Sequence, residues 1–125
     1  MYQYKAKLIR VVDGDTVDAM IDCGFSTFKK ERIRLYGIDT PECRTRDKKE
    51  KARGLAAKAR LEELIAEGNN EFIIETSIDK KGKYGRLLGV LYKYPEDASP
   101  FSSTGSYNEK LIAEGHAKEY LGGKK

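Results

Sequence analysis

The sequence has 125 residues, a length typical of one domain, and we expect a single domain over residues 1–125. Charged residues make up 35% of the chain, and the mean hydropathy is −0.65. No apolar run approaches the ~20 residues of a membrane-spanning helix, so we expect no membrane partner. The 24 Lys and Arg exceed the 20 Asp and Glu, for a formal net charge of +4, which is compatible with a polyanionic partner without establishing one.

Residues 1–7 alternate polar and apolar side chains and lack the apolar core of a signal peptide. We therefore expect a cytoplasmic protein, or a secreted one if a leader was removed before this numbering begins. The two cysteines, Cys23 and Cys43, follow no zinc or redox spacing, so we expect two free thiols in a reducing compartment. We also expect a monomer.

The first third of the chain alternates apolar and polar residues, the pattern of half-buried strands. The pattern predicts strands over residues 2–12, 16–22 and 28–36. Asp13-Gly14-Asp15 is a turn signal between the first two strands, and Cys23-Gly24 interrupts the alternation before the third. The sequence therefore predicts a three-stranded meander.

Residues 48–67 change to a helical period. The apolar and small residues of this segment lie on one helical face, and we expect them to be buried: Gly54, Ala57, Leu61, Leu64 and Ile65. Lys and Glu occupy the other face. Gly68-Asn69-Asn70 predicts the end of the helix.

The remaining segments alternate strands with polar loops. We expect strands over residues 72–78 and 86–92, separated by a polar loop at 79–83. A Pro, Ser and Gly-rich loop over 95–106 precedes a short helix over 107–115, and residues 121–125 form a frayed tail. This order predicts a mainly β (α+β) fold: a five-stranded OB-type Greek-key barrel with a helix between strands three and four and a short C-terminal helix.

Three polar clusters provide the groups that phosphodiester hydrolysis needs. The transition state gathers negative charge on phosphoryl oxygens, which guanidinium groups and a hard cation neutralise, while a carboxylate orients the attacking water. Arg34 lies near the end of the predicted third strand and Asp39 and Glu42 in the loop that follows it, and loops at a barrel rim are the usual place for a site. The clusters are Asp13-Gly14-Asp15-Thr16, the segment from Arg34 to Glu42, and Lys83-Tyr84-Gly85-Arg86.

Each cluster taken alone also has an ordinary structural interpretation. Asp13-Gly14-Asp15 is a good turn. Asp39-Thr40-Pro41-Glu42 resembles a helix N-cap with proline at the first position. Arg34 is also consistent with an exposed strand charge, and residues 83–86 with a hairpin turn.

The three clusters in this order and spacing resemble the staphylococcal nuclease family. The resemblance runs from Val11 to about Tyr120 and includes the late helix segment over residues 108–117. It implies a calcium-dependent nuclease that hydrolyses phosphodiester bonds of DNA and/or RNA without strong sequence specificity and leaves 3′-phosphate products. By resemblance, the calcium ligands are Asp15, Asp39 and the backbone carbonyl of Thr40.

The same resemblance implies roles for the remaining site residues. Glu42 matches the glutamate that positions the nucleophilic water. Arg34 and Arg86 match the arginines that bind the phosphate and stabilise the transition state. Lys83 and Tyr84 match positions that contact the terminal phosphate of a bound nucleotide.

A different class of function stays open, a non-catalytic barrel module of this family that binds nucleic acid or a protein partner. The acids discriminate between the two. Clustered carboxylates at Asp15, Asp39 and Glu42 repel nucleic-acid phosphates unless a cation lies among them, so a binding module has no need of all three.

Overall fold

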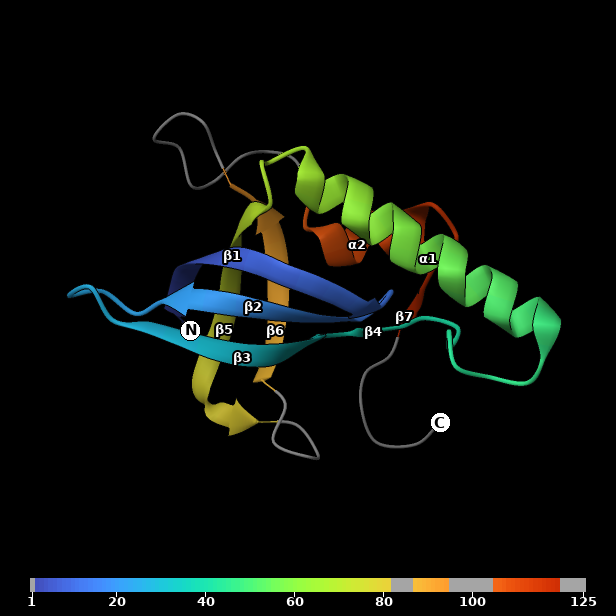
Figure 1. Ribbon diagram of the computed structural model, residues 1–125, viewed down its shortest axis with the longest axis horizontal. Helices are drawn as coiled ribbons and strands as arrows, with labels where there is room; N and C mark the ends of the chain where they lie inside the picture. The colour runs from blue at the N-terminus through green and yellow to red at the C-terminus, as the bar shows by residue number, and fades with distance from the viewer. Residues whose placement is uncertain (1, 82–86, 95–104, 120–125) are drawn as a thin grey trace.

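The computed structural model describes residues 2–81, 87–94 and 105–119. Five strands form a closed barrel in the order β1-β2-β3-β6-β5, in which β3 and β6 are parallel and the other neighbours antiparallel. Figure 1 shows the barrel beside helix α1. The predicted barrel with a helix between its third and fourth strands is therefore confirmed. The strands are β1 (Tyr2–Asp13), β2 (Thr16–Asp22), β3 (Phe28–Leu35), β5 (Glu71–Lys81) and β6 (Leu87–Lys93).

A second, two-stranded sheet was not predicted. It pairs β4 (Ile38–Asp39) with β7 (Lys118–Glu119), with Asp39 opposite Lys118. Each strand has two residues, too few to show any periodicity in the sequence. The pairing nevertheless fixes the segment that directly follows β3.

Helix α1 (Lys48–Ala66) begins and ends close to the predicted residues. Asp47 caps its first turn, because the carboxylate accepts hydrogen bonds from the backbone N–H groups of Lys49 and Glu50. After the helix, Asn69 and Asn70 take left-handed backbone conformations. The buried residues of the helix are the five predicted ones: Gly54, Ala57, Leu61, Leu64 and Ile65.

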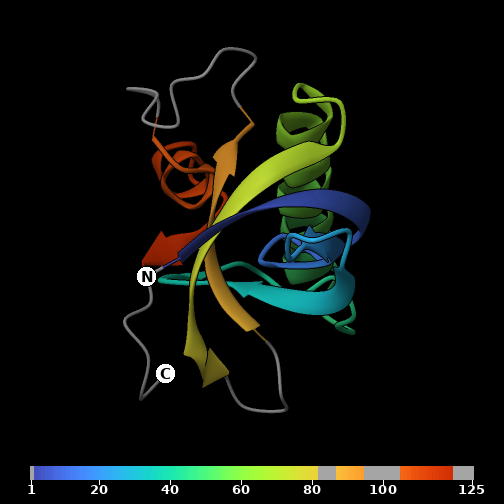
Figure 2. The same cartoon turned by 90° about the vertical axis from the view of Figure 1, so that its left-hand side faces the viewer.

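The core lies inside the barrel and beneath the two helices. In the view of Figure 2, α1 and α2 (Tyr107–Ala113) appear to the right and left of the strands, and the Arg60 side chain of α1 donates to Glu114 at the C-terminal end of α2 at 2.7 Å. Buried residues alternate with half-buried ones along residues 71–76 of β5 and 87–92 of β6, as the period of two predicts. The fully buried side chains include Val17, Ile33, Leu35, Leu61, Phe72, Ile74, Leu91 and Leu111.

Two predicted boundaries differ from the structure by two residues or more. Strand β5 continues to Lys81, so the polar loop predicted from residue 79 begins later, because backbone pairing between Lys81 and Leu87 extends the ladder through polar residues. The second helix ends at Ala113, two residues before Gly115, whose positive φ of 82° terminates it. The predicted loop at 95–104 and the tail at 121–125 lie outside the described residues.

The outer face of β1, β2 and β3 carries a charged row. Asp18 accepts hydrogen bonds from Arg32 Nε at 2.8 Å and from Arg10 Nε at 3.0 Å. The three residues stand opposite one another on adjacent strands, so this ion-pair network joins three strands of the barrel. Within the described part of the chain, no helix combines the length and apolar character needed to cross a membrane.

Candidate functional site

The turn between β1 and β2 holds the Asp15 carboxylate in a buried position. Thr16 Oγ1 donates to Asp15 Oδ1 at 3.0 Å, and the Thr40 N–H donates to Asp15 Oδ2 at 3.1 Å. The turn packs closely on α1, since a Cβ at Gly14 would lie 2.7 Å from the Ala57 Cβ. Asp15 therefore links the turn to the segment after β4.

Arg34 lies at the end of β3, where its guanidinium contacts both carbonyls and carboxylates. Nη1 donates to the carbonyl of Ile38 at 2.9 Å and to that of Leu35 at 3.1 Å. The chain reverses between these carbonyls at Gly37, which has a positive φ of 80°. These bonds fix the guanidinium, whose five N–H groups form a planar fork suited to phosphate oxygens.

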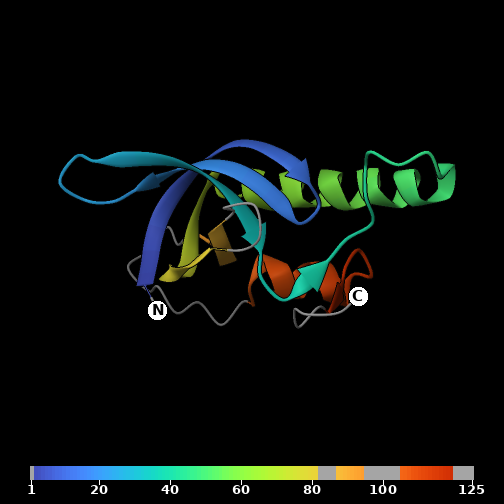
Figure 3. The same cartoon turned by 90° about the horizontal axis from the view of Figure 1, so that it is seen from below.

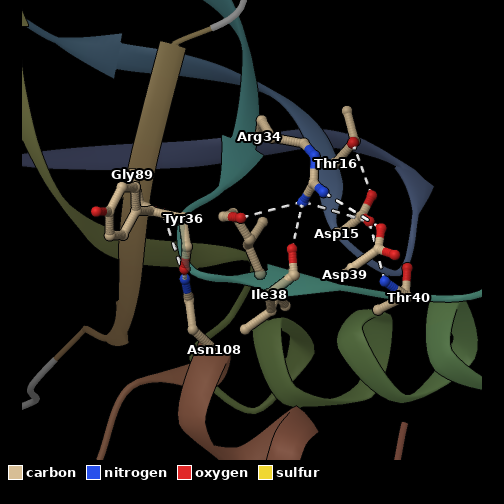
Figure 4. Close-up of polar contacts among 10 residues, drawn as sticks. Asp15, Thr16, Arg34, Tyr36, Ile38, Asp39, Thr40, Gly89 and Asn108 are labelled. Atoms are coloured by element: carbon tan, nitrogen blue, oxygen red, sulfur yellow. Dashed lines mark hydrogen bonds and ion pairs between the residues drawn. The ribbon is translucent and has the colours of Figure 1, made fainter. Parts of the chain in front are cut away.

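Two carboxylates share this one guanidinium. Arg34 Nη1 is 3.3 Å from Asp15 Oδ2, and Nη2 is 3.4 Å from Asp39 Oδ1. Figure 4 shows the two carboxylates on the same side of the guanidinium, with the Ile38 carbonyl on another. Asp15 is 25 residues from Thr40, so the barrel brings together groups that are distant in the sequence.

The loop from Thr40 to Glu42 follows β4 and rests on helix α1. Thr40 is buried, whereas Glu42 is exposed. The backbone of the loop touches the helix so closely that a Cβ at Gly54 would lie 2.6 Å from the Glu42 carbonyl oxygen. The structure thus brings the predicted residues Asp15, Arg34, Asp39 and Thr40 together and places Glu42 on the adjoining loop.

The other three predicted residues, Lys83, Tyr84 and Arg86, lie outside the described residues. The segment they belong to joins β5 to β6. The first residue of β6, Leu87, pairs with Ile33 in β3.

Two further residues of this region had no functional role in the sequence prediction. Asp13 Oδ1 is buried without a hydrogen-bond partner among the described residues. Burial, together with a hydrogen bond to Asp13, raises the pKa of the Cys43 thiol to about 11. The only sequence signal for the contact between Asp13 and Cys43 was that Asp13 is an acidic residue two positions before Asp15.

Asn108 was also missed, although it supports the site from α2. Its side chain accepts from the Leu91 N–H at 3.1 Å and donates to the Tyr36 carbonyl at 2.7 Å. Figure 4 shows this bridge from the helix to the turn that follows β3. A lone asparagine 72 residues from its partner gives no local sequence signal.

The described residues contain no group of three or more His, Cys, Asp or Glu side chains that could hold a metal ion. The candidate donors are instead two carboxylates and the neighbouring backbone. Thr40 Oγ1, also buried, has no hydrogen-bond partner among the described residues. All these donors are oxygens, which suit a hard cation such as calcium or magnesium better than zinc.

The fold and the site define a class: small OB-type barrels with an acid and arginine cluster beside the turn of β1 and β2. A sequence model of the family of staphylococcal nuclease homologues matches residues 32–124 of the chain. The chain belongs to the staphylococcal nuclease family.

Sequence comparison with individual proteins agrees with this family membership. The chain is 29% identical to the micrococcal nuclease of Shigella flexneri, over 94% of the chain and 59% of that protein. It is 32% identical to the endonuclease YncB of Bacillus subtilis, over 89% of the chain and 46% of that protein. It is 30% identical to the thermonuclease of Staphylococcus hyicus, over 90% of the chain and 57% of that protein. The chain thus spans about half of the curated relatives it matches.

Proposed function

We propose that this protein is a calcium-dependent nuclease that hydrolyses phosphodiester bonds of DNA and/or RNA without strong sequence specificity, leaving 3′-phosphate products. The observation that carries the proposal is the contact of the Arg34 guanidinium with the carboxylates of both Asp15 and Asp39. The membership of the family and the names of the relatives support it.

The donor set fits a calcium ion. Asp15 and Asp39 supply two carboxylates beside the Arg34 guanidinium, and carboxylate oxygens are ligands that calcium prefers. We assign Asp15, Asp39 and the Thr40 carbonyl as its protein ligands, and water or substrate oxygens would complete the six to eight ligands that calcium prefers. When bound there, the cation supplies charge neutralisation at the phosphate.

The residues of this chain supply the other steps. Arg34 donates hydrogen bonds to phosphoryl oxygens, on which negative charge builds in the transition state. Glu42 accepts a proton from the attacking water and orients it, a role open to an exposed loop carboxylate. By family resemblance, Arg86 stabilises the leaving-group side, and Lys83 and Tyr84 bind a terminal phosphate.

The test is digestion of single-stranded DNA, double-stranded DNA and RNA with calcium and with a chelator. Glu42→Gln is compared with Glu62→Gln, an exposed glutamate on α1 far from the proposed ligands. We expect calcium-dependent cleavage that Glu42→Gln lowers at least 100-fold and Glu62→Gln leaves intact, because general-base catalysis contributes roughly 10²–10⁴-fold.

Two results contradict the proposal. Cleavage by Glu42→Gln at the wild-type rate would remove Glu42 from the mechanism. Intact substrate in every reaction, with binding still visible by gel shift, would favour the alternative of a non-catalytic module that binds nucleic acid.

A calcium titration of Asp39→Asn by calorimetry checks the metal assignment separately, because loss of a carboxylate ligand weakens calcium binding.

A further inference from the structure

The outer face of β3 forms a continuous path from the tip of the β2–β3 hairpin to the candidate site. Alternate residues of a strand share one face, which here places Phe28, Lys30, Arg32 and Arg34 in line. Six residues of strand span roughly 20 Å, so Phe28 lies about that far from Arg34. Figure 3 shows the hairpin, in light blue, projecting from the barrel away from the N-terminal end of α1.

Neighbouring strands widen this path and make it basic. Lys7 and Lys30 flank Met20 in one cross-strand row, and Arg10 and Arg32 flank Asp18 in the next. The four basic side chains are exposed, whereas Asp18 is buried beneath its two arginines. The other acids in these rows are Asp22, opposite Phe28, and Glu71, opposite Lys7 on β5, and Glu71 is paired with Lys5 at 2.8 Å. The surface charge of the path therefore favours an anionic chain.

The hairpin tip presents aromatic side chains from an ordered turn. The Cys23 N–H donates to the Thr27 carbonyl at 2.8 Å, and the Thr27 N–H donates to the Gly24 carbonyl at 2.9 Å. Phe25 is completely exposed, with a relative accessibility of 101%, and Phe28 is 60% exposed. Neither ring therefore contributes much to the core.

Phe25 also adopts an unfavourable backbone conformation. Its φ of 53° lies in the left-handed region, where glycine or asparagine is preferred and a bulky residue is an outlier. The position thus combines backbone strain with a fully hydrated aromatic ring. Neither property stabilises the folded chain, so the residue is better explained by a ligand than by folding.

We propose that this surface, the hairpin track of Lys7, Arg10, Phe25, Phe28, Lys30 and Arg32, binds single-stranded nucleic acid beyond the scissile phosphate. The basic residues contact phosphates, and bases stack on the two phenylalanines. Single strands fit because their bases are free to stack on side chains, whereas those of a duplex are stacked on one another. The inference rests on the proposed function, since the track leads to Arg34.

Binding is measured by fluorescence anisotropy of a labelled thymidine oligonucleotide of about 15 nucleotides, with chelator present so that no cleavage occurs. The variants are the double substitution Phe25→Ala and Phe28→Ala, and Lys30→Gln. Leu55→Ala, which truncates an apolar side chain of α1 that is 46% exposed, is the control. Because the mutated residues are exposed, the variants should fold, and their melting temperatures verify this.

We expect the double variant to bind at least fivefold more weakly than Leu55→Ala, because base stacking on one aromatic changes affinity about 5- to 100-fold. Lys30→Gln should weaken binding and reduce its dependence on salt. Cleavage of a dinucleotide, too short to reach the hairpin, should stay at the wild-type rate, while KM for long single strands rises.

Equal affinities of the double variant and Leu55→Ala would overturn the inference. Loss of binding to phosphatidylserine vesicles with unchanged oligonucleotide binding would also overturn it, in favour of a membrane surface. The results distinguish failure of this inference from failure of the proposed function. If the wild-type protein binds the oligonucleotide through Phe25 and Phe28 but never cleaves it, only the nuclease proposal is contradicted. If the protein cleaves the dinucleotide but its oligonucleotide binding does not depend on Phe25 and Phe28, only the hairpin track is contradicted.

Discussion

Cys43 and Cys23 differ in burial, and their chemistry should differ accordingly. Cys43 is buried and follows Glu42, whereas Cys23 is exposed in the hairpin turn, and both thiols are free, as predicted from their spacing. The pKa of Cys43 is raised from 9.0 to about 11, mainly by burial. Because the thiolate is the reactive form, the reactive fraction of Cys43 falls on the order of 100-fold.

We therefore expect one thiol of the native protein to react rapidly with Ellman's reagent at pH 8 and the second only after unfolding. Cys23→Ser should remove the rapid phase and leave the slow one. Equal rates for the two thiols in the native wild-type protein would contradict the burial of Cys43.

At this scale, the residue types of the site could be predicted from sequence but their contacts could not. Asp15, Arg34 and Asp39 were expected together because their chemistry is complementary, and Thr40 was expected with them through the family resemblance. The structure places all four in contact. The Asn108 bridge and the contact between Asp13 and Cys43 depend on residues that only the tertiary fold brings near. Their side chains carry no local pattern that distinguishes them from a turn or helix residue.

Among the elements, helix α1 acts as the platform for the site. Gly54 lies against the Pro41 and Glu42 backbone, and Ala57 lies against Gly14. A glycine inside a helix costs about 1 kcal/mol relative to alanine. The structure explains the glycine, since only a residue without a Cβ lets the helix approach the Pro41 and Glu42 backbone this closely.

Gly54→Ala should consequently lower activity, although alanine favours a helix by about 1 kcal/mol. A Cβ there would lie 2.6 Å from the Glu42 carbonyl oxygen and 2.8 Å from that of Pro41, so the loop must move. We expect at least a tenfold fall in cleavage rate, because small displacements of catalytic groups have large effects on rate. The readouts are kcat and the melting temperature.

The control is Ala59→Gly on the exposed face of α1. It should reduce stability by about 1 kcal/mol through helix propensity alone and leave kcat unchanged. Wild-type kcat in Gly54→Ala would show that the close packing does not position Glu42.

The prediction of each element depended on how clear its periodic pattern was. The 19 residues of α1 gave a period clear enough to identify all five of its buried residues. The two-residue strands β4 and β7 gave none, and they lie far apart in the sequence. Strand β5 was predicted too short, since its last three residues are of polar types, although Lys81 pairs with Leu87.

For the whole molecule, the Asp18 network should govern stability in acid. Hydrogen bonds from Arg32 outweigh the effect of burial and, together with Arg10, lower the pKa of Asp18 from 3.8 to about 2. A carboxyl group with a lowered pKa stabilises the fold above its unfolded pKa. This contribution is lost as the pH falls from about 4 through about 2.

Asp18→Asn should reduce the free energy of unfolding at pH 7 by about 1–2 kcal/mol. The value is moderate because the Arg10 and Arg32 side chains are 58% and 46% exposed, and solvent screens the pair. Urea unfolding between pH 7 and pH 2 should show the variant and wild-type free energies converging in acid. As a control, Glu62→Gln, which replaces an exposed acid, should give a plot of unfolding free energy against pH that is parallel to that of wild type. If Asp18→Asn is less stable than wild type by the same amount at every pH, the charge of Asp18 is not the cause of the loss.

The pairing of β4 with β7 has a consequence for the order in which the protein is made. Asp15, Arg34 and Asp39 are synthesised early, but β7, which holds the strand of Asp39, comes near the end of the described chain. β6, which closes the barrel against β3, also follows α1. A growing chain on the ribosome therefore carries the acids and the arginine before it can hold them in place. For a protein proposed to cut RNA, we therefore expect the site to form only after β6 and β7 have been synthesised.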